Sequence, residues 1–480
     1  MMKHIIITLL GTICTIAVFS QVRNGGFEDL QKNQPSAWFI QPQSGYTSSV
    51  DSMVRYSGAR SFSISNATEK SAFQSFSQTV PLNIAGTKKI VIRAVLKTSG
   101  VAANASIWCQ VWNDTKQIDF SNLAMQGQVL NGTNDWKEYS VSFIVQPDAK
   151  RLVLGGLLSG TGTVWFDDFS VTQVNFPSTP AEEPAAGFIE EVKKVIRKNA
   201  LYSDSLNWKQ IDETIGVISG GMKTSSDAKP VISYLVGQLR KAGDNHSFHM
   251  SVTASKNYTQ PAKKLEDATS SLLPGNIGYI SVPGFGSTND SAMTVFAQKI
   301  QDLVRELDSK NKISGWIVDL RKNTGGNMYP MIAGLGPFLN KGYLGYFVRG
   351  RHKNPWSISG KGNKAWSGSA VVPAAYRLRN TSGKTAVLVG PSTASSGEFT
   401  TISFIGQSNT RLFGQPTAGY TTANSMFPLS DGSTLLLATT YAADRKKHNH
   451  IGPIIPDILV EQLKDKDADV EAATNWILEK

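Results

Sequence analysis

The chain has 480 residues, of which 40% are hydrophobic and 18% are charged. These proportions exclude an intrinsically disordered chain and a membrane-like composition, and the length suffices for two or three domains with their own cores. The formal net charge is +11, but the basic residues are scattered and the densest run is only Arg445-Lys446-Lys447. The composition therefore predicts a solvated basic surface and no nucleic-acid partner.

The first twenty residues, 1–20, have the pattern of a secretory signal peptide. Lys3 and His4 precede an apolar run over 5–19, and Ser20 follows it. The run is too short for a transmembrane helix, and no later apolar stretch reaches about 18 residues. We therefore expect an exported bacterial protein, periplasmic or extracellular, with no membrane span.

Residues 22–175 have the pattern of a β-sandwich. Short segments with alternating apolar residues, such as 89–95, 105–112 and 139–145, are separated by Gly, Asn, Ser and Pro. Many short strands at regular spacing, with almost no helical period, are typical of an all-β sandwich domain. Four tryptophans could stack on sugar rings, but at strand positions they are predicted to lie in the core; they are Trp38, Trp108, Trp112 and Trp136.

This stretch resembles the jelly-roll carbohydrate-binding modules of secreted bacterial proteins. The similar segments are Asn24-Gly25-Gly26-Phe27-Glu28, Pro35-Ser36-Ala37-Trp38 and Gly162-Thr163-Val164-Trp165-Phe166-Asp167-Asp168-Phe169. The resemblance implies that a glycan is the partner of this domain. It also implies a structural calcium ion held by Glu28 and Asp168, because carboxylate oxygens suit that ion.

Residues 176–186 contain three prolines among small and acidic residues, which predicts a semi-rigid linker between two domains. A helical period begins at residue 187. Apolar residues share one helical face over 189–196 and again over 227–242, so 187–265 is predicted to be a small helical subdomain.

Strands alternate with helices over 266–480. Apolar strands are predicted over 277–282, 315–320 and 385–389, and an amphipathic helix over 291–308. This alternation predicts an α/β layer whose functional residues lie at the ends of the strands.

Three segments of this region carry residues suited to nucleophilic catalysis. Ser395 lies in a small-residue turn between a predicted strand and a helix, although serine there could simply cap the helix. Gly325 and Gly326 follow another strand, in a turn that lets N–H groups approach a substrate oxygen or is only an ordinary turn. His246 and His249 follow a helix, where an imidazole could serve as base or be a surface residue.

Together and in this order, the three segments resemble the C-terminal processing (tail-specific) serine peptidase family. The matching motifs are a His loop, the turn Asp319-Leu320-Arg321-Lys322-Asn323-Thr324-Gly325-Gly326 and the Ser-x-x-Glu turn Ser395-Ser396-Gly397-Glu398. Further matches run through 413–419 and 452–457. The resemblance covers about 187–480 and implies a ClpP/crotonase-like α/β protease fold with Ser395 as nucleophile.

One position separates this chain from the lysine-dependent branch of the family. That branch has its lysine base 25 residues after the nucleophile, where this sequence has Tyr420. The chain therefore resembles the tricorn-core-like branch, which implies His246 as base, with His249 as the alternative. For the third member of the triad, Asn449 and Asp444 are the candidates. The short spacing between His246 and residue 278 leaves no room for the peptide-binding PDZ domain of many relatives.

The sequence thus predicts a secreted serine endopeptidase that hydrolyses protein or peptide substrates through an acyl-enzyme. The resemblance implies that the N–H groups of Gly325 or Gly326, and of Ser396, hold the oxyanion, and that catalysis requires no cofactor. Two alternatives stay open. The chain could be a catalytically impaired scaffold that binds glycans or peptides, or a serine hydrolase that acts on esters.

Overall fold

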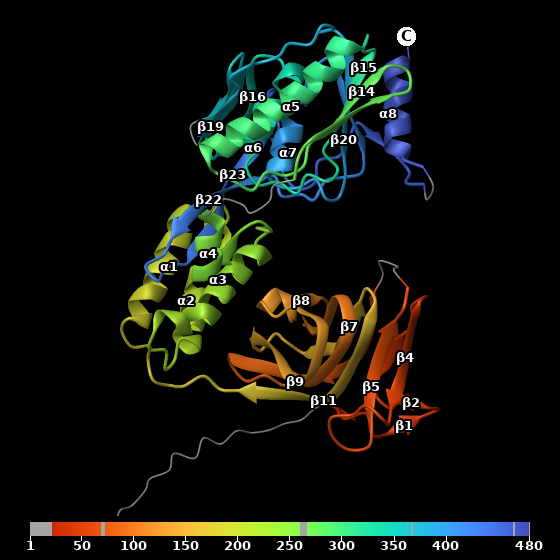
Figure 1. Ribbon diagram of the computed structural model, residues 1–480. Helices are drawn as coiled ribbons and strands as arrows, with labels where there is room; N and C mark the ends of the chain where they lie inside the picture. Colours follow the sequence, from red (N-terminus) through yellow and green to blue (C-terminus); the bar gives the residue numbers. More distant parts are fainter. Residues whose placement is uncertain (1–21, 69–72, 260–265, 366–367, 464–465, 480) are drawn as a thin grey trace, which may run out of the picture. The chain divides into compact units, whose positions relative to one another are not determined.

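The computed structural model describes residues 22–68, 73–259, 266–365, 368–463 and 466–479. The predicted signal peptide lies outside the described residues. Two compact units are present (Figure 1). The first contains the described residues up to Glu182 together with Lys209–Lys223, and the second contains Glu183–Trp208 and Thr224 onward. Helix α2 (Trp208–Ile218) therefore groups almost entirely with the first unit, although the sequence analysis placed it in the helical subdomain.

The first unit is a curled β-sandwich, as predicted. Its long strands follow the order β3-β6-β10-β7-β11-β5-β4, and β8 and β9 also pair with β7. A short hairpin, β1 (Leu30–Gln31) and β2 (Gln34–Pro35), precedes them. The strands are β3 (Phe39–Gln41), β4 (Tyr46–Asp51), β5 (Ser61–Asn66), β6 (Phe73–Pro81), β7 (Lys88–Trp112), β8 (Gln117–Asn122), β9 (Leu130–Val145), β10 (Arg151–Ser159) and β11 (Gly162–Val174).

Strand β7 joins the two layers of the sandwich. The segments predicted as separate strands, 89–95 and 105–112, are the two ends of this one 25-residue strand. Its first half pairs with β11 and its second half with β10, while the pairing with β9 shifts register repeatedly between Leu96 and Ala105. Such bulges bend a strand. Gly100, with φ 60°, lies at the bend, where a residue without a side chain adopts this backbone at no steric cost.

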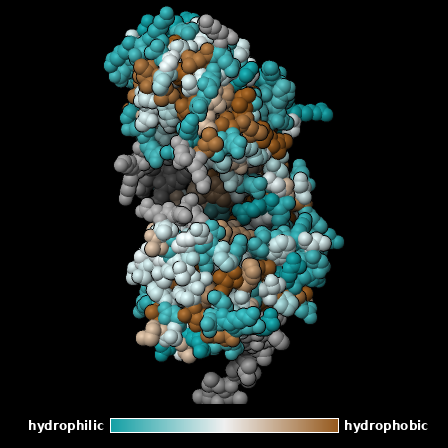
Figure 2. Space-filling model, turned by 90° about the vertical axis from the view of Figure 1, so that its right-hand side faces the viewer, coloured by the Kyte–Doolittle hydropathy of each residue, from teal (hydrophilic) through white to brown (hydrophobic). Residues whose placement is uncertain are grey.

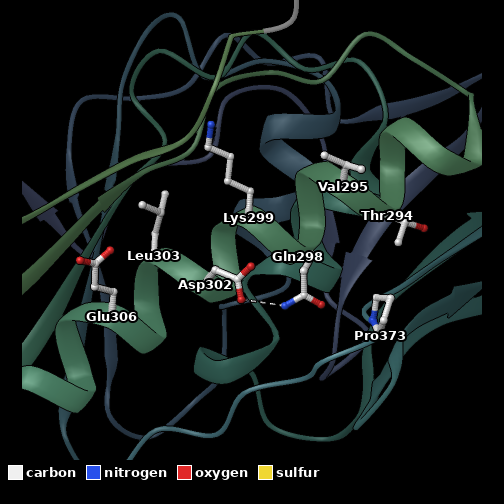
Figure 3. A pocket seen from close by; sticks show the side chains of 8 residues that line it. All are labelled: Thr294, Val295, Gln298, Lys299, Asp302, Leu303, Glu306 and Pro373. Carbon is white, nitrogen blue, oxygen red and sulfur yellow. Dashed lines mark hydrogen bonds between the residues drawn. The ribbon is translucent and has the colours of Figure 1, made fainter.

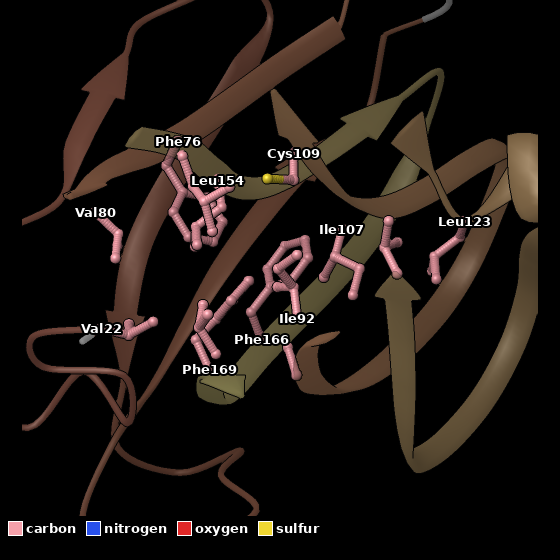
Figure 4. Packing of buried hydrophobic residues seen from close by; sticks show 14 of the residues in the cluster. Val22, Phe76, Val80, Ile92, Ile107, Cys109, Leu123, Leu154, Phe166 and Phe169 are labelled. Atoms are coloured by element: carbon pink, nitrogen blue, oxygen red, sulfur yellow. The ribbon is translucent and has the colours of Figure 1, made fainter. Parts of the chain in front are cut away.

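Aliphatic side chains and a group of phenylalanine rings pack together in the core of the sandwich (Figure 4). Phe76 packs with its ring centroid 4.8 Å from that of Phe62 and 5.0 Å from that of Phe166. Trp38 is 7% exposed and belongs to this core, so its prediction is confirmed. The prediction is wrong for the other three tryptophans of the set, which are half-buried because their strand positions point away from the inner face.

The second unit contains the remaining helices. The apolar face predicted over 189–196 is confirmed, because Ile189, Val192 and Ile196 of α1 are buried. The helices are α1 (Ala185–Asn199), α3 (Lys229–Lys241), α4 (Val252–Thr259), α5 (Asp290–Lys310), α6 (Met328–Gly334), α7 (Ser396–Ile402) and α8 (Ala468–Leu478).

A six-stranded sheet forms the centre of this unit, in the order β13-β14-β15-β20-β21-β25. All neighbours are parallel except the edge strand β13. Trp316 and Val318 of β15 face the cluster that includes α5, whereas Ile317 faces α8. The strands are buried on both sides, which explains their continuous apolar runs. Their bounds are β13 (Thr269–Leu273), β14 (Ile277–Ser281), β15 (Gly315–Asp319), β20 (Lys384–Val389), β21 (Thr410–Gly414) and β25 (Ile458–Leu459).

A second sheet, which the sequence analysis did not predict, brings the His loop to the rest of the unit. Its order is β12-β23-β16-β17-β18-β19, with β22 and β24 also paired to β23. Because β12 directly follows the His loop and pairs with β23, the loop is fixed beside β22. The strands are β12 (Phe248–Met250), β16 (Gly342–Arg349), β17 (His352–Ser359), β18 (Gly362–Ala365), β19 (Gly368–Val371), β22 (Thr422–Pro428), β23 (Thr434–Asp444) and β24 (Asn449–His450).

The surface shown in Figure 2 carries hydrophobic residues in small groups interspersed among hydrophilic ones. Among the described residues, none of the helices is both long and apolar enough to cross a membrane.

Candidate active site

The turn between β20 and α7 holds Ser395 in an uncommon backbone conformation. Its φ is 52° and its ψ is −120°, outside the regions that residues other than glycine usually occupy. The Ser395 N–H donates to Glu398 Oε2 at 2.9 Å, which fixes the turn from within the helix that follows. Strained residues of this kind cluster at active sites, because the surrounding structure must hold them in place.

The Gly325-Gly326 turn lies directly against Ser395. A Cβ atom added to Gly325 would be 2.9 Å from Ser395 Cβ and 3.1 Å from the Ser396 nitrogen. Both glycines have φ above 100°, and a side chain on Gly326 would meet the Phe285 carbonyl oxygen at 2.3 Å. Only glycine allows this close approach at these two positions.

Two backbone N–H groups are available beside the Ser395 side chain. The Gly325 N–H donates to Asn323 Oδ1 at 3.0 Å, so this donor is already used. Within the described residues, no acceptor faces the N–H of Gly326 or of Ser396. The Ser396 hydroxyl donates to the Gly326 carbonyl at 2.6 Å and holds these two segments together. Of the three residues predicted for the oxyanion hole, Gly326 and Ser396 therefore have free donors.

The His loop is shaped by a buried carboxylate. Asp244, which is 2% exposed, accepts hydrogen bonds from the backbone N–H groups of His246 and Ser247, at 3.0 and 2.9 Å. The Ser247 hydroxyl donates to the same carboxylate at 2.6 Å and accepts from the Ala438 N–H of β23. This network attaches the loop to the second sheet. It also orients His246, which lies between Asp244 and Ser247 in the chain.

The imidazole of His246 is oriented by the first residue of β22. Its Nδ1 lies 2.9 Å from the Thr422 carbonyl oxygen and 3.1 Å from Thr422 Oγ1. A carbonyl oxygen only accepts, so Nδ1 carries the proton and Nε2 is left as the basic nitrogen. Burial lowers the pKa of His246 below its ordinary value, which favours the neutral ring at pH 7.

A pocket of about 150 Å³ opens beside this imidazole. Its wall includes Tyr202, Asp244, Tyr420 and Ile451. The Tyr420 ring lies 5.3 Å from the His246 ring, centroid to centroid, at an interplanar angle of 33°. The residue that replaces the lysine base of the other branch thus packs on the histidine.

Neither candidate for the third triad member contacts His246 in the described part of the chain. Asp444 accepts from the N–H groups of Lys446 and His448, at 2.8 and 3.1 Å, and so stabilises its own turn. Asn449 is exposed on β24, opposite Ala443.

The structure instead shows Thr422 as the partner of His246, a residue that the sequence analysis missed. No sequence signal marks Thr422 as this partner. The shorter of its two contacts with His246 is made by its backbone carbonyl, a group that every residue has. The alternative base, His249, lies on β12 opposite Leu435, and its buried Nε2 has no hydrogen-bond partner among the described residues.

A larger hollow of about 420 Å³ follows one face of α5 (Figure 3). Val295, Leu303 and Pro373 contribute its apolar part, and Gln298 donates to Asp302 within it. Its lining contains none of the predicted site residues.

The two carboxylates predicted to hold calcium lie on either side of Gly26. A Cβ atom added there would be 3.5 Å from Asp168 Oδ1 and 3.8 Å from Glu28 Cγ. Glu28 Oε1 accepts from the N–H groups of Ala59 and Arg60, and Asp168 Oδ1 accepts from the Ser57 hydroxyl.

Within the described residues, no three His, Cys, Asp or Glu side chains are placed to hold a metal ion. The structure shows the two acids holding the loop that contains Ser57, Ala59 and Arg60. The calcium ion remains a prediction.

Comparison with known proteins agrees with both halves of the fold. Residues 276–460 match the model of peptidase family S41, and residues 20–155 match a carbohydrate-binding domain family. The nisin-resistance protein of Lactococcus lactis subsp. lactis is 29% identical over 345 residues, which cover 68% of this chain and 97% of that protein.

The carboxy-terminal processing protease CtpA of Bacillus subtilis is 31% identical over 173 residues, covering 36% of this chain and 32% of that protein. A solved structure of a lipoprotein from Streptococcus agalactiae aligns with a TM-score of 0.48 and 25% identity, over 61% of this chain and 96% of that one. The chain thus joins a peptidase family S41 domain, of the C-terminal processing protease family, to an N-terminal carbohydrate-binding domain.

Proposed function

We propose that the protein is an exported serine-type endopeptidase in which Ser395 and His246 act as a catalytic pair. The observation that carries the proposal is the contact between the Gly325-Gly326 turn and Ser395, which leaves two N–H groups free beside a strained serine. The neutral, Nδ1-protonated imidazole of His246 supplies a base in the same unit. Membership of a peptidase family favours a polypeptide substrate.

In this mechanism, His246 Nε2 removes the proton of the Ser395 hydroxyl as Oγ attacks the peptide carbonyl carbon. The carbonyl oxygen becomes an oxyanion that accepts from the N–H groups of Gly326 and Ser396. The imidazolium then protonates the leaving amine, and the C–N bond breaks to give an acyl-enzyme. Water, deprotonated by the same histidine, then attacks the ester carbon. The acyl C–O bond breaks to release the acid, and the imidazolium returns the proton to Ser395 Oγ.

The mechanism has no carboxylate behind the histidine. The Thr422 carbonyl accepts a hydrogen bond from Nδ1–H and so holds the tautomer and the ring orientation, which are two of the roles of the acid in a triad. A carbonyl dipole stabilises imidazolium less than a full negative charge does. The nearby Asp244, whose charge raises the pKa of His246, partly supplies that charge without touching the ring nitrogens.

The N-terminal unit is proposed to bind a glycan on the outer face of the layer that contains β9. Trp136 of this strand is half-buried and pairs with the exposed ring of Tyr56, at 5.9 Å between centroids. On the same strand, Glu138 lies 3.6 Å from Arg93 of β7. Aromatic rings beside charged and hydrogen-bonding groups suit a sugar, which has both apolar faces and hydroxyls.

A glycan array with Trp136→Ala tests the binding role. We expect loss of about tenfold or more in affinity for any bound glycan, since one stacking ring contributes about 1–3 kcal/mol. Trp112→Ala is the matched control, because that ring lies under Arg151 on the other half of β7. Equal losses in both variants would place the glycan elsewhere.

The catalytic proposal is tested by labelling the purified chain from residue 22 with a fluorophosphonate probe. We expect stoichiometric labelling that Ser395→Ala abolishes and His246→Ala reduces by at least about 10³-fold. Ser392→Ala, an exposed serine of the same turn, and His352→Ala, an exposed histidine of β17, are the matched controls and should label normally.

The remaining alternatives give different outcomes. A labelled enzyme that cleaves acyl esters but no member of a peptide library would be a serine esterase. A wild-type chain that does not label would be a binding scaffold.

A further inference from the structure

Glu398 is a charged side chain with no solvent exposure. An isolated buried carboxylate is costly, so its surroundings must satisfy it. Burial raises its pKa, and hydrogen bonds to the ionised form oppose that rise. These bonds come from two separate segments of the chain, which is more than a helix cap requires.

The first segment is the nucleophile turn. Glu398 Oε2 accepts from the Ser395 N–H at 2.9 Å. The second segment starts 19 residues after Glu398 and leads into β22. Glu398 Oε1 accepts from the Thr417 hydroxyl at 2.5 Å and from the Gly419 N–H at 2.9 Å. One carboxylate therefore connects the two segments through opposite oxygens.

The second segment holds His246. Tyr420, directly after Gly419, packs its ring on the imidazole, and the Thr422 carbonyl accepts a hydrogen bond from Nδ1–H. One further bond joins the two segments directly, because the Ala418 N–H donates to the Thr393 carbonyl at 2.9 Å. The chain of contacts thus runs from Ser395 through Glu398 to the residues that orient His246.

We propose that Glu398 is a positioning residue that sets the place of His246 relative to Ser395. The proposal rests on the proposed function and deepens it. Glu398 touches neither ring nitrogen of His246 and does not take part in proton transfer. It acts by holding Thr417 and Gly419, and through them Tyr420 and Thr422, at a fixed distance from the nucleophile turn.

The chemistry of the bridge requires a carboxylate. The partners of Glu398 all donate, and they are the Thr417 hydroxyl and the N–H groups of Ser395, Gly419 and Tyr420. An ionised carboxylate accepts on both oxygens. In Glu398→Gln the amide presents an oxygen on one side and an NH₂ group on the other. Glutamine suits the helix-capping position, so we expect the oxygen to keep the Ser395 N–H. The NH₂ group then faces the Gly419 N–H, and that connection is lost.

The test uses the full chain and two measurements. The histidine rings are labelled with ¹⁵N and followed by NMR through a pH titration, with His246→Ala to assign the resonance. In Glu398→Gln we expect the His246 pKa to rise toward 6.5, its ordinary value, and the Nδ1-protonated tautomer to lose its dominance. We also expect fluorophosphonate labelling to slow about 10- to 100-fold, because small misplacements have effects of that size.

Asn289→Ala is the matched control for loss of a helix cap. Asn289 accepts from the Ala292 N–H at the start of α5 and has no contact with the site. This variant should lower the melting temperature of the second unit while leaving the His246 titration and the labelling rate unchanged. A loss of labelling in Glu398→Gln that merely follows its melting temperature, as in this control, would overturn the proposal.

A double-mutant cycle isolates the bridge itself. Thr417→Val removes one donor to Glu398. If the carboxylate acts through this segment, the double variant Glu398→Gln/Thr417→Val labels little more slowly than Glu398→Gln alone. Fully additive losses would overturn the proposal. A His246 titration in Glu398→Gln that matches the wild-type titration would also overturn the proposal. This measurement does not depend on labelling, so it decides the role of Glu398 even if the wild-type serine does not label and the proposed function fails.

Discussion

The two units of the molecule use buried residues for different purposes. The core of the sandwich is built from apolar side chains, with Phe62 and Phe76 packed edge to face. The sandwich also buries some polar side chains, among them Gln74 and Asp167. The second unit also has an apolar core, and it buries charged and amide groups in the segments that carry Ser395, the Gly325-Gly326 turn and His246, where Asp244, Asn323 and Glu398 are at most 2% exposed. Apolar burial contributes stability without direction, whereas each buried polar group fixes the geometry of its partners.

This contrast has a consequence for mutation. Truncating an aromatic ring in the sandwich should reduce stability and leave the chemistry intact. Replacing a buried polar side chain of the second unit by a nearly isosteric one should impair the chemistry and leave the stability almost unchanged.

Phe76→Ala should lower the free energy of unfolding of the sandwich by about 3–5 kcal/mol, because it removes a ring that is 1% exposed and leaves a cavity. Denaturant unfolding followed by tryptophan fluorescence measures the change. Phe73→Ala is the matched control on the same strand, since Phe73 is 58% exposed, and its effect should stay within about 0.5 kcal/mol. Labelling of Ser395 should be normal in both variants, and a parallel loss of labelling would contradict the separation of roles.

The pH dependence of labelling should report on the burial of His246. Because burial lowers the pKa of His246 below 6.5, the ring stays neutral and labelling stays constant from pH 8 down to 6.5. Asp244 opposes this shift without reversing it. Below the folded pKa the rate should fall about tenfold per pH unit.

The lowered pKa of His246 also makes the stability of the second unit depend on pH. The unfolded chain binds the proton at a higher pH than the folded one, so the second unit should become less stable as the pH falls below 6.5. His352→Ala should follow the wild-type profiles. If the labelling rate fell with a midpoint above pH 6.5, the His246 imidazole would be exposed to solvent, contrary to this prediction.

Ser395→Gly should be more stable than Ser395→Ala by about 1 kcal/mol, although neither variant can label. The residue has φ 52° and ψ −120°, which glycine tolerates and alanine does not. Thermal unfolding of the two variants side by side gives the difference. Equal stability would show that the turn relaxes once the hydroxyl is removed, and that the strain depends on the serine itself.

Much of the fold could be predicted from the sequence, because local patterns specify local structure. The apolar alternation predicted the sandwich and the helical period predicted α1 and α3, while the apolar runs over 277–282 and 315–320 predicted the parallel strands. The prediction that 89–95 and 105–112 are separate strands was wrong. Continuity through Gly100 depends on pairing with partners on both layers, which no short window contains.

For the site, the order of the motifs by itself identified Ser395, the Gly325-Gly326 turn and His246 as residues to examine together. Only the tertiary structure showed that the Gly325 N–H is already used by Asn323, and that Thr422, not Asp444 or Asn449, accepts a hydrogen bond from His246 Nδ1. The reason is physical. A side chain with special chemistry leaves a trace in the sequence, whereas a backbone carbonyl acquires its role only when strands distant in the chain are brought together by pairing.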